Sequence, residues 1–327
     1  MTLVIPTTPF ERAAIRYIRH QHALGKHFVR QQWVIGRLAR FLAQRAATDV
    51  DAALFEAWCQ VRRSTSPTNR RGEALIIRKL CLYRQRTESG CFVPDPLYFP
   101  RRTPPIAPVI FGSDEVRRML QVIDAWPPHP QLPLRKAAMR ISVILLYTAG
   151  LRRGELTKLT LADVDLRSQV LRIRESKFHK SRFVPLSPSA TRELRQYLKV
   201  RVASPWDIRA EAPLLGHQHG SVHFRGYVPE AIGSSIRKIF KDAEVHDPHG
   251  RRPRLHDFRH SFAVQALLRW YRAGADVQAK LPQLSMYMGH VSIASTAYYL
   301  HFIPAIAAAA HRRFERHFGP IARGGAR

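Results

Sequence analysis

The sequence predicts a mainly α-helical protein with a small β-sheet, organised as two domains of unequal size. Apolar residues recur at three- and four-residue steps along most of the chain, which is the spacing of one face of an α-helix. Two short β-like runs, VLRIRE and RFVPL, lie close together in the second half. A proline-rich stretch at residues 93–112 interrupts every periodic pattern and is expected to be a linker.

Residues 1–92 are expected to form a small helical domain. Its amphipathic segments are FERAAIRYIRHQHA, HFVRQQWVIGRLARFLAQR, DAALFEAWCQVRR after a cap at Asp51, and PTNRRGEALIIRKLCLYRQR with Pro67 near its start. Basic residues run along these segments, so the domain is a candidate DNA clamp, although such charge is usually a solvated face. The three cysteines have no metal-ligand spacing and are expected to be reduced thiols.

Residues 113–327 are expected to form the larger domain. Ser113 is the predicted N-cap of the helix DEVRRMLQVIDAW, and a buried helix, LRKAAMRISVILLYTAG, follows. The two β-like runs are predicted to pair as a hairpin around SKFHKS. Further helices are expected at SATRELRQYLKVRV, EAIGSSIRKIFKDA, SFAVQALLRWY and, at the C-terminal end, within IPAIAAAAHRRFERHF.

The charge balance predicts a polyanionic partner. Lys and Arg total 53 against 24 acidic residues, giving a net charge of +29 that would repel itself in a compact fold. The cations are spread over the whole length, which favours double-stranded DNA over a membrane surface. No signal peptide is visible, and the longest apolar stretch, ISVILLYTAG, is too short to cross a bilayer. A cytoplasmic, nucleoid-associated protein is therefore expected.

The segment AGLRRGEL places Arg152 just after Gly150, at the edge of a long apolar run. A guanidinium in that position is costly unless it has an anionic partner. Glu155, three residues later, is close enough on a helix to hold it in place. A structural ion pair explains this segment about as well as an anion-binding site.

The segment HDFRH places His256 and Arg259 on one helical face and Asp257 and His260 on another. Asp257 and His260 are expected to serve the start of the helix and its packing. His256 and His260 also have the spacing of a zinc pair, but no third ligand is marked, so no metal is expected.

The segment YMGHVSIASTAYYLH contains a turn at Gly289, then His290, and later Tyr298 and Tyr299. A lone tyrosine at such a place is usually part of the core. Nearby cations favour the phenolate, however, and make a tyrosine a better nucleophile. Together with the two arginines, the histidines and a hairpin lysine, it completes the parts of a metal-free phosphoryl transfer site.

In their order and spacing these segments resemble the catalytic domain of the tyrosine recombinases, the phage integrase family, over residues 112–310. The preceding helical domain resembles the core-binding domain of that family. The resemblance implies that Arg152 and Arg259 hold the scissile phosphate with His290 as a further donor. It also implies that Glu155 supports Arg152, Lys177 is the general acid, His256 assists proton transfer and Tyr299 is the nucleophile.

Several positions depart from the family pattern. Gly154 stands where Ser or Thr is common, and Ala149 replaces a usual Thr. Lys180 is a rival to Lys177, and Tyr298 is a rival to Tyr299. The stretch RAGADVQAKLPQLSMY is a few residues longer than is typical.

The implied activity is cleavage and rejoining of DNA through a 3′-phosphotyrosine intermediate, in integration, transposition or dimer resolution. Because the bond energy stays in the ester, no ATP, metal or other cofactor is expected. Four protomers assembled on two DNA sites are implied. The alternatives are a type IB topoisomerase, a non-catalytic DNA-binding protein and a metal-dependent nuclease that uses some of the 16 histidines.

Overall fold

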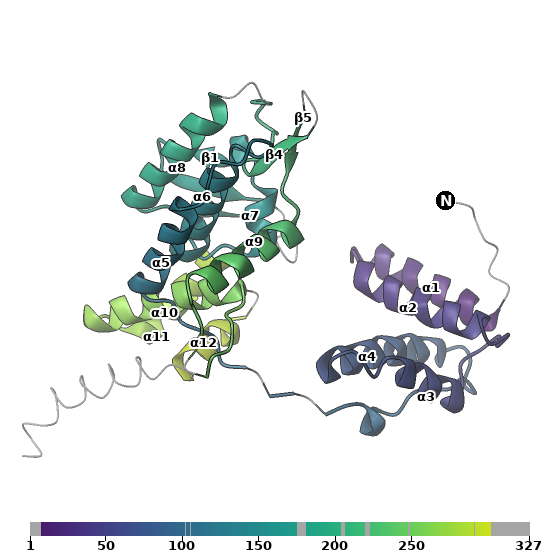
Figure 1. The fold of residues 1–327 in the computed structure, drawn as a ribbon. Helices are drawn as coiled ribbons and strands as arrows, with labels where there is room; N and C mark the ends of the chain where they lie inside the picture. The colour runs from purple at the N-terminus through teal and green to yellow at the C-terminus, as the bar shows by residue number, and fades with distance from the viewer. Residues whose placement is uncertain are drawn as a thin grey trace, which may run out of the picture. The chain divides into compact units, whose positions relative to one another are not determined.

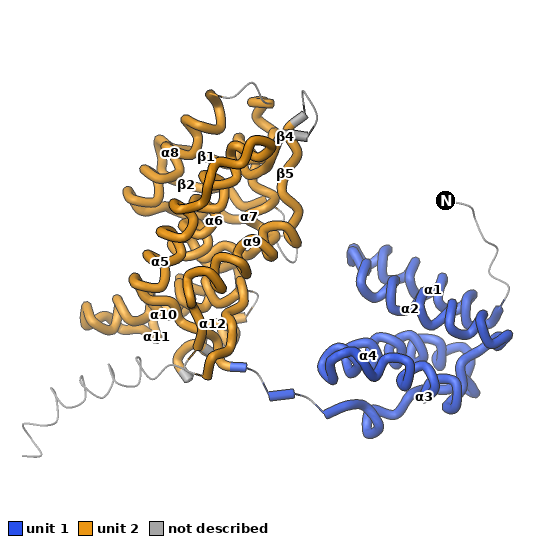
Figure 2. The backbone as a smooth tube through the Cα atoms, viewed as in Figure 1, with its two compact units in different colours: residues 1–106 blue, residues 107–327 orange. Residues whose placement is uncertain are grey.

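The computed structural model describes residues 8–101, 103–104, 106–174, 181–203, 207–219, 223–247, 249–290 and 292–301. The chain divides into two compact units, residues 1–106 and 107–327 (Figure 2). Helices dominate both units, and two small antiparallel sheets lie in the second (Figure 1). The mainly α fold with a small β-sheet is confirmed. In the described part of the chain, no helix is both long and apolar enough to cross a membrane.

Unit 1 contains the four predicted helices, α1 (Pro9–Ala23), α2 (Val29–Ala43), α3 (Ala52–Val61) and α4 (Pro67–Arg84). Local capping fixes where they start: the Asp51 carboxylate accepts the Leu54 amide at 2.7 Å, as its position in the sequence predicted. Their apolar faces meet in one core, which includes Val34, Leu38 and Ile77. A 3₁₀ turn at Pro96–Tyr98 follows α4.

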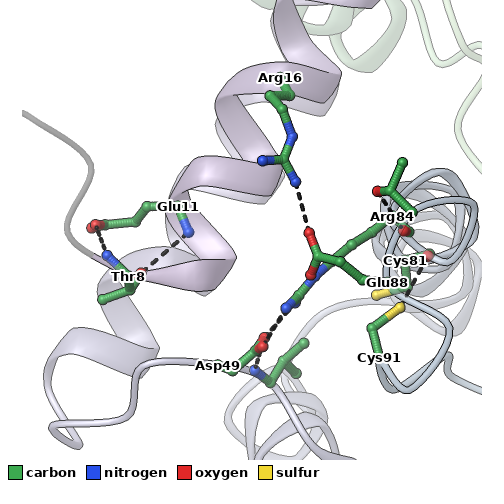
Figure 3. Close-up of polar contacts among 10 residues, drawn as sticks. Thr8, Glu11, Arg16, Asp49, Cys81, Arg84, Glu88 and Cys91 are labelled. Carbon is green, nitrogen blue, oxygen red and sulfur yellow. Dashed lines mark hydrogen bonds and ion pairs between the residues drawn. The ribbon is translucent and has the colours of Figure 1, made fainter.

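An ion-pair cluster joins the C-terminal end of α4 to the rest of unit 1 (Figure 3). The Arg84 guanidinium contacts both oxygens of Asp49 at 2.5 Å and also Glu88. Glu88 in turn accepts from Arg16 of α1 at 2.7 Å. We call Arg16, Asp49, Arg84 and Glu88 the unit 1 ion cluster, in which the two cations and two anions balance.

Unit 2 is built around α6 (Arg135–Thr148), whose residues from Ala138 to Leu146 are almost all buried. It is packed by α5 (Ser113–Asp124), α8 (Pro188–Val202), α9 (Pro229–Asp242) and α10 (His256–Arg272). The predicted cap at Ser113 is wrong by one residue. Gly112 occupies the N-cap position, because its amide donates to Glu115 at 2.9 Å.

The predicted hairpin forms from β2 (Val170–Ile173) and β3 (Arg182–Pro185), with β1 (Val164–Asp165) on the far side of β2. Ile173 pairs with Arg182 where the ladder ends. A second hairpin, β4 (Gly216–His219) and β5 (His223–Gly226), was not predicted. The remaining elements are α7 (Arg153–Lys158), a 3₁₀ turn at Leu161–Asp163, α11 (Val277–Met288) and α12 (Ala294–His301). The predicted C-terminal helix beyond His301 lies outside the described residues.

Candidate active site

The turn between α6 and α7 determines where Arg152 lies. Gly150 has φ +59°, and a Cβ built on it would lie 2.6 Å from the Phe262 ring, so this turn requires glycine. The turn brings Arg152 to the N-cap position of α7. From there its guanidinium donates to the Glu155 carboxylate at 2.7 Å and to the Gly289 carbonyl at 2.9 Å.

Glu155 is the carboxylate around which this region is organised. Its side chain is only 4% exposed. It accepts the Arg152 amide at 2.9 Å as well as the Arg152 guanidinium, and both terminal nitrogens of Arg182 donate to it at 2.9 Å. Burial would raise the pKa of Glu155, but the hydrogen bonds and charges of Arg182 and Arg152 outweigh it and hold the pKa at about 2. Glu155 is therefore ionised at neutral pH.

Arg259 on α10 is 1% exposed. It donates to the Gly150 carbonyl at 2.6 Å and to the Met288 carbonyl. Its Nε has no partner among the described residues, and none of the described carboxylates forms an ion pair with it. Burial and the nearby charge of Arg152 lower the pKa of Arg259 to about 9. The buried cation is therefore held by carbonyl dipoles and lacks a neutralising anion.

Tyr299 lies on α12 and is 3% exposed. Its ring contacts two histidines, with centroids 5.4 Å from His260 and 6.4 Å from His290. It is also close enough to Arg259 for an electrostatic interaction. His256, at the exposed start of α10, meets His260 edge to face at 4.7 Å. One histidine-lined patch thus connects Tyr299 to the start of α10.

These histidines are neutral at pH 7. Burial first, and then the positive charge of their neighbours, lowers the pKa of His260 to about 3 and that of His290 to about 4. His256 is exposed as a residue, but its ring packs against His260, and this burial of the ring, with the charge of Arg259, lowers its pKa. Gly289, at φ +63°, ends α11 and leads directly to His290. The His290 Nδ1 then lies 2.8 Å from the Thr296 hydroxyl, which fixes the ring orientation.

The structure brings together most of the predicted site residues: Arg152, Glu155, His256, Arg259, His290 and Tyr299. Lys177 and Lys180 lie outside the described residues, as does the side chain of Tyr298. Asp257 serves the start of α10, as expected, by accepting the Arg254 amide at 2.9 Å. Within the described ranges no three His, Cys, Asp or Glu side chains gather as a metal site, so the histidine pair lacks a third ligand there.

Sequence reasoning missed Arg182 and Thr296 and gave His260 only a packing role. Arg182 contacts Glu155 and the Tyr287 carbonyl, which are 27 and 105 residues away in the chain. No spacing rule joins such distant residues. Thr296 could have been identified from the sequence. It lies between His290 and Tyr299, in the first turn of the helix that contains Tyr299, where its hydroxyl can reach His290.

Comparison with known proteins identifies the family. The model of the phage integrase family matches residues 110–304. A putative integrase/recombinase, y4rB of Sinorhizobium fredii (strain NBRC 101917 / NGR234), is 32% identical over 308 residues, covering 94% of this chain and 97% of the relative. The chain belongs to the phage integrase family. The present chain is also 27% identical to the tyrosine recombinase XerD of Ralstonia nicotianae, over 83% of this chain and 79% of the relative.

Solved structures show the same fold. The Tn1549 transposon integrase, in complex with a circular intermediate DNA, matches 94% of the recombinase and 99% of its own chain with a TM-score of 0.64 at 18% identity. A lambda integrase dimer bound to a core site matches 86% of this chain and 93% of its own chain, with a TM-score of 0.58 at 13% identity. The recombinase is a DNA strand-cleaving and -joining enzyme that acts by site-specific recombination, as the sequence predicted.

Proposed function

We propose that the recombinase cleaves DNA by attack of the Tyr299 hydroxyl on a scissile phosphate. A bond forms between the tyrosine oxygen and phosphorus, and the bond from phosphorus to the 5′-oxygen breaks. The tyrosine then carries the 3′-phosphate, and the 5′-oxygen leaves as a hydroxyl after taking up a proton. A 5′-hydroxyl of the partner strand reverses these steps and restores a phosphodiester, so one phosphate ester bond forms for each one that breaks.

One observation carries this proposal: three arginine side chains lie close together beside a buried tyrosine, and a single carboxylate, paired with two of them, is their counter-ion. We call Arg152, Arg182 and Arg259 the arginine cluster. Among the described carboxylates, Glu155 is the one that pairs with this cluster, which leaves two positive charges without a counter-ion. A phosphodiester supplies one negative charge, and a second develops in the transition state. The cluster is therefore preorganised for that state.

The free donors decide which arginines contact the phosphate. Arg152 is partly exposed, and the buried Nε of Arg259 has no partner among the described residues, so in this proposal these two arginines hold the non-bridging oxygens. The His290 ring adds a further donor in this proposal. We assign the Thr296 hydroxyl as the donor to Nδ1, which places the ring proton on Nε2, where it is available to the phosphate.

Two proton transfers complete the reaction. In our proposal Lys177 protonates the leaving 5′-oxygen, and neutral His256 assists removal of the tyrosine proton. Burial of the ring and the charge of Arg259 lower the pKa of His256, which favours the neutral ring that accepts a proton. Lys180 is the alternative acid, and parallel substitution of the two lysines by methionine distinguishes them.

We further propose that unit 1 clamps the DNA and that four protomers assemble on two sites. The high net charge supports the clamp. Assembly is supported by the crystal structure of lambda integrase, which is a dimer bound to DNA. Light scattering of the protein with a duplex holding one site, and then with a duplex holding two, measures the protomer number. A complex that never exceeds one protomer per duplex would contradict the assembly.

Covalent trapping tests the nucleophile. Duplexes bound by the Tyr299→Phe protein are selected from a random-sequence library, and a nick is then placed beside each position so that cleavage releases a short fragment. The full chain should form a protein–DNA adduct that survives denaturation, and Tyr299→Phe should form none while binding DNA as before. Tyr298→Phe is the matched control and should form the adduct. The reverse pattern would move the nucleophile by one residue.

A further inference from the structure

The C-terminal end of α11 provides three successive carbonyl acceptors, one for each member of the arginine cluster. Arg182 donates from Nε to the Tyr287 carbonyl at 2.7 Å, Arg259 donates to Met288, and Arg152 donates to Gly289 at 2.9 Å. Carbonyls in the last turn of a helix lack intrahelical partners and carry partial negative charge. The preceding carbonyls, of Ser285 and Met286, accept the His290 and Gly289 amides. Every carbonyl from 285 to 289 is therefore satisfied.

Arg182 differs from the other two arginines because its donors are already used. Its terminal nitrogens form a fork with the two oxygens of Glu155, and Nε reaches Tyr287. Its side chain is 10% exposed. Little of the guanidinium is thus left to bind a DNA phosphate. Arg182 must therefore act through the groups that it holds, Glu155 and the Tyr287 carbonyl.

The position of Arg182 in the chain connects three parts of the site. It is the first residue of β3, directly after the segment that contains Lys177 and Lys180. Through Glu155 it contacts the residue that orients Arg152. Through Tyr287 it contacts the helix end that leads into His290. It also packs over Gly289, where a built Cβ would come within 3.1 Å of its Nη1, so a side chain there would displace it.

We propose that Arg182 is a positioning residue of the cleavage reaction, which fixes the Glu155–Arg152 pair and the end of α11 relative to each other. The proposal rests on the function proposed above. A fork of two charge-assisted hydrogen bonds fixes orientation as well as distance, which a single lysine ammonium does not. Without Arg182, Glu155 would remain buried with Arg152 as its one ion-pair partner, and Arg152 would lose its fixed orientation.

Adduct formation by Arg182→Met, Arg182→Lys and Arg140→Met on the nicked duplex tests this proposal. Arg140 is a matched control, since it also makes two hydrogen bonds to one carboxylate, from Nε and Nη2 to Glu193 at 3.0 and 2.9 Å, and it contacts Asp124. Arg140 lies ten residues before Gly150 in the chain. At the rise of a helix, this corresponds to about 15 Å along the axis of α6. We expect Arg182→Met to bind the duplex normally and to form the adduct roughly 100-fold more slowly. Arg140→Met should stay within about threefold of the wild-type rate.

The pH profile separates positioning from a merely structural role. Besides Arg152 and Arg182, Glu155 faces Arg259 and a hollow lined by the charged residues Lys158, Asp163, Arg172 and Arg174. Removal of the Arg182 fork lets burial raise the pKa of Glu155, so Glu155 takes up a proton at higher pH than in the wild type. The rate of Arg182→Met should therefore fall as the pH is lowered, in a range where the wild-type rate is constant. Adding Glu155→Gln should remove this acid-side decrease.

The outcomes separate this inference from the proposed function. No adduct with the wild-type chain would remove both. An adduct with the wild type, and an Arg182→Met rate within about threefold of it at every pH, would overturn the positioning role alone. If Arg182→Met does not fold, Arg182→Lys decides the matter. It should be roughly tenfold slower than the wild type because it keeps the charge and loses the fork, and a wild-type rate and profile would overturn the inference.

Discussion

Arg84 in unit 1 and Arg259 in unit 2 are both buried arginines, yet their pKa values move in opposite directions. Hydrogen bonds to Asp49, with those to Glu88, raise the pKa of Arg84 above its usual value. Burial and the charge of Arg152 lower the pKa of Arg259 to about 9. The difference lies in the partners: carboxylates neutralise Arg84, whereas carbonyl oxygens orient Arg259 without neutralising it.

This contrast separates stability from function. In the unit 1 ion cluster, the attraction of Asp49 and Glu88 offsets the desolvation cost of burying Arg84, so the cluster needs no further ligand (Figure 3). In the arginine cluster, part of the cost of burial remains until an anion arrives. A buried cation that is oriented but not neutralised is a candidate for binding an anionic ligand.

The largest expected effect is on catalysis by Arg259→Met. This change removes the proposed phosphate contact and a charge, so adduct formation should fall by roughly 1,000-fold or more. The stability of unit 2 should stay the same or rise, because replacing a buried uncompensated charge by an apolar chain of similar size is often neutral or favourable. Adduct rates and urea midpoints measure the two effects. A large loss of stability would show that Arg259 is structural, as Arg84 is.

A smaller effect on catalysis is expected for Arg259→Lys. The charge stays but the planar fork is lost, so the rate of adduct formation should fall by roughly 100-fold while DNA affinity changes little. Gel-shift titration and single-turnover cleavage on the same duplex give the two numbers. Equal losses in affinity and rate would place Arg259 outside the site of reaction.

In unit 1, Arg84→Met should act on stability alone. Asp49 and Glu88 are each about one-third exposed and can regain water, so we expect a loss of about 1–3 kcal/mol. Adduct formation per folded molecule should not change. Chemical unfolding followed by the fluorescence of unit 1 tryptophans measures the loss. If Arg84→Met unfolds at the wild-type midpoint, charge balance does not stabilise this cluster.

The smallest expected effect is the response of stability to acid. The folded-state pKa values of His260 and His290, about 3 and 4, lie below the unfolded value of 6.5. The unfolded chain therefore binds more protons between about pH 4 and 6.5, and stability falls as the pH is lowered through that range. His260→Gln should lose less stability between pH 7 and 5 than the wild type, with exposed His22→Gln as the control. Equal losses in both variants would contradict the proposed source of the acid sensitivity.

The sequence predicted most helices and one of the two hairpins. The β4–β5 hairpin was missed because GHQHGSVHFRG lacks the apolar alternation that marks a strand. Helix α11 was missed because Pro282 lies inside it, and its sequence looked like an overlong connection. The secondary structure of both segments depends on tertiary packing, which local sequence patterns do not contain.

For the site, the sequence identified residues that stand out locally. Arg152 and Arg259 border apolar runs, and His290 and Tyr299 follow a glycine turn. The residues that it missed act through distant partners: Arg182 hydrogen-bonds a carbonyl 105 residues later in the chain. The catalytic roles of all these residues remain predictions, and those of Lys177 and Lys180 concern side chains outside the described residues.

The shared acceptors at the end of α11 restrict how this enzyme can be re-engineered. Chimaeras that exchange the Gly150–Glu155 turn, the start of β3, α10 or α11 singly would pair an arginine of one parent with a carbonyl of the other. Because three side chains from separate segments converge on consecutive peptide units, a small shift of that helix end would misplace all of them at once. New DNA specificity is therefore best introduced outside these four segments, which should be transplanted as one block.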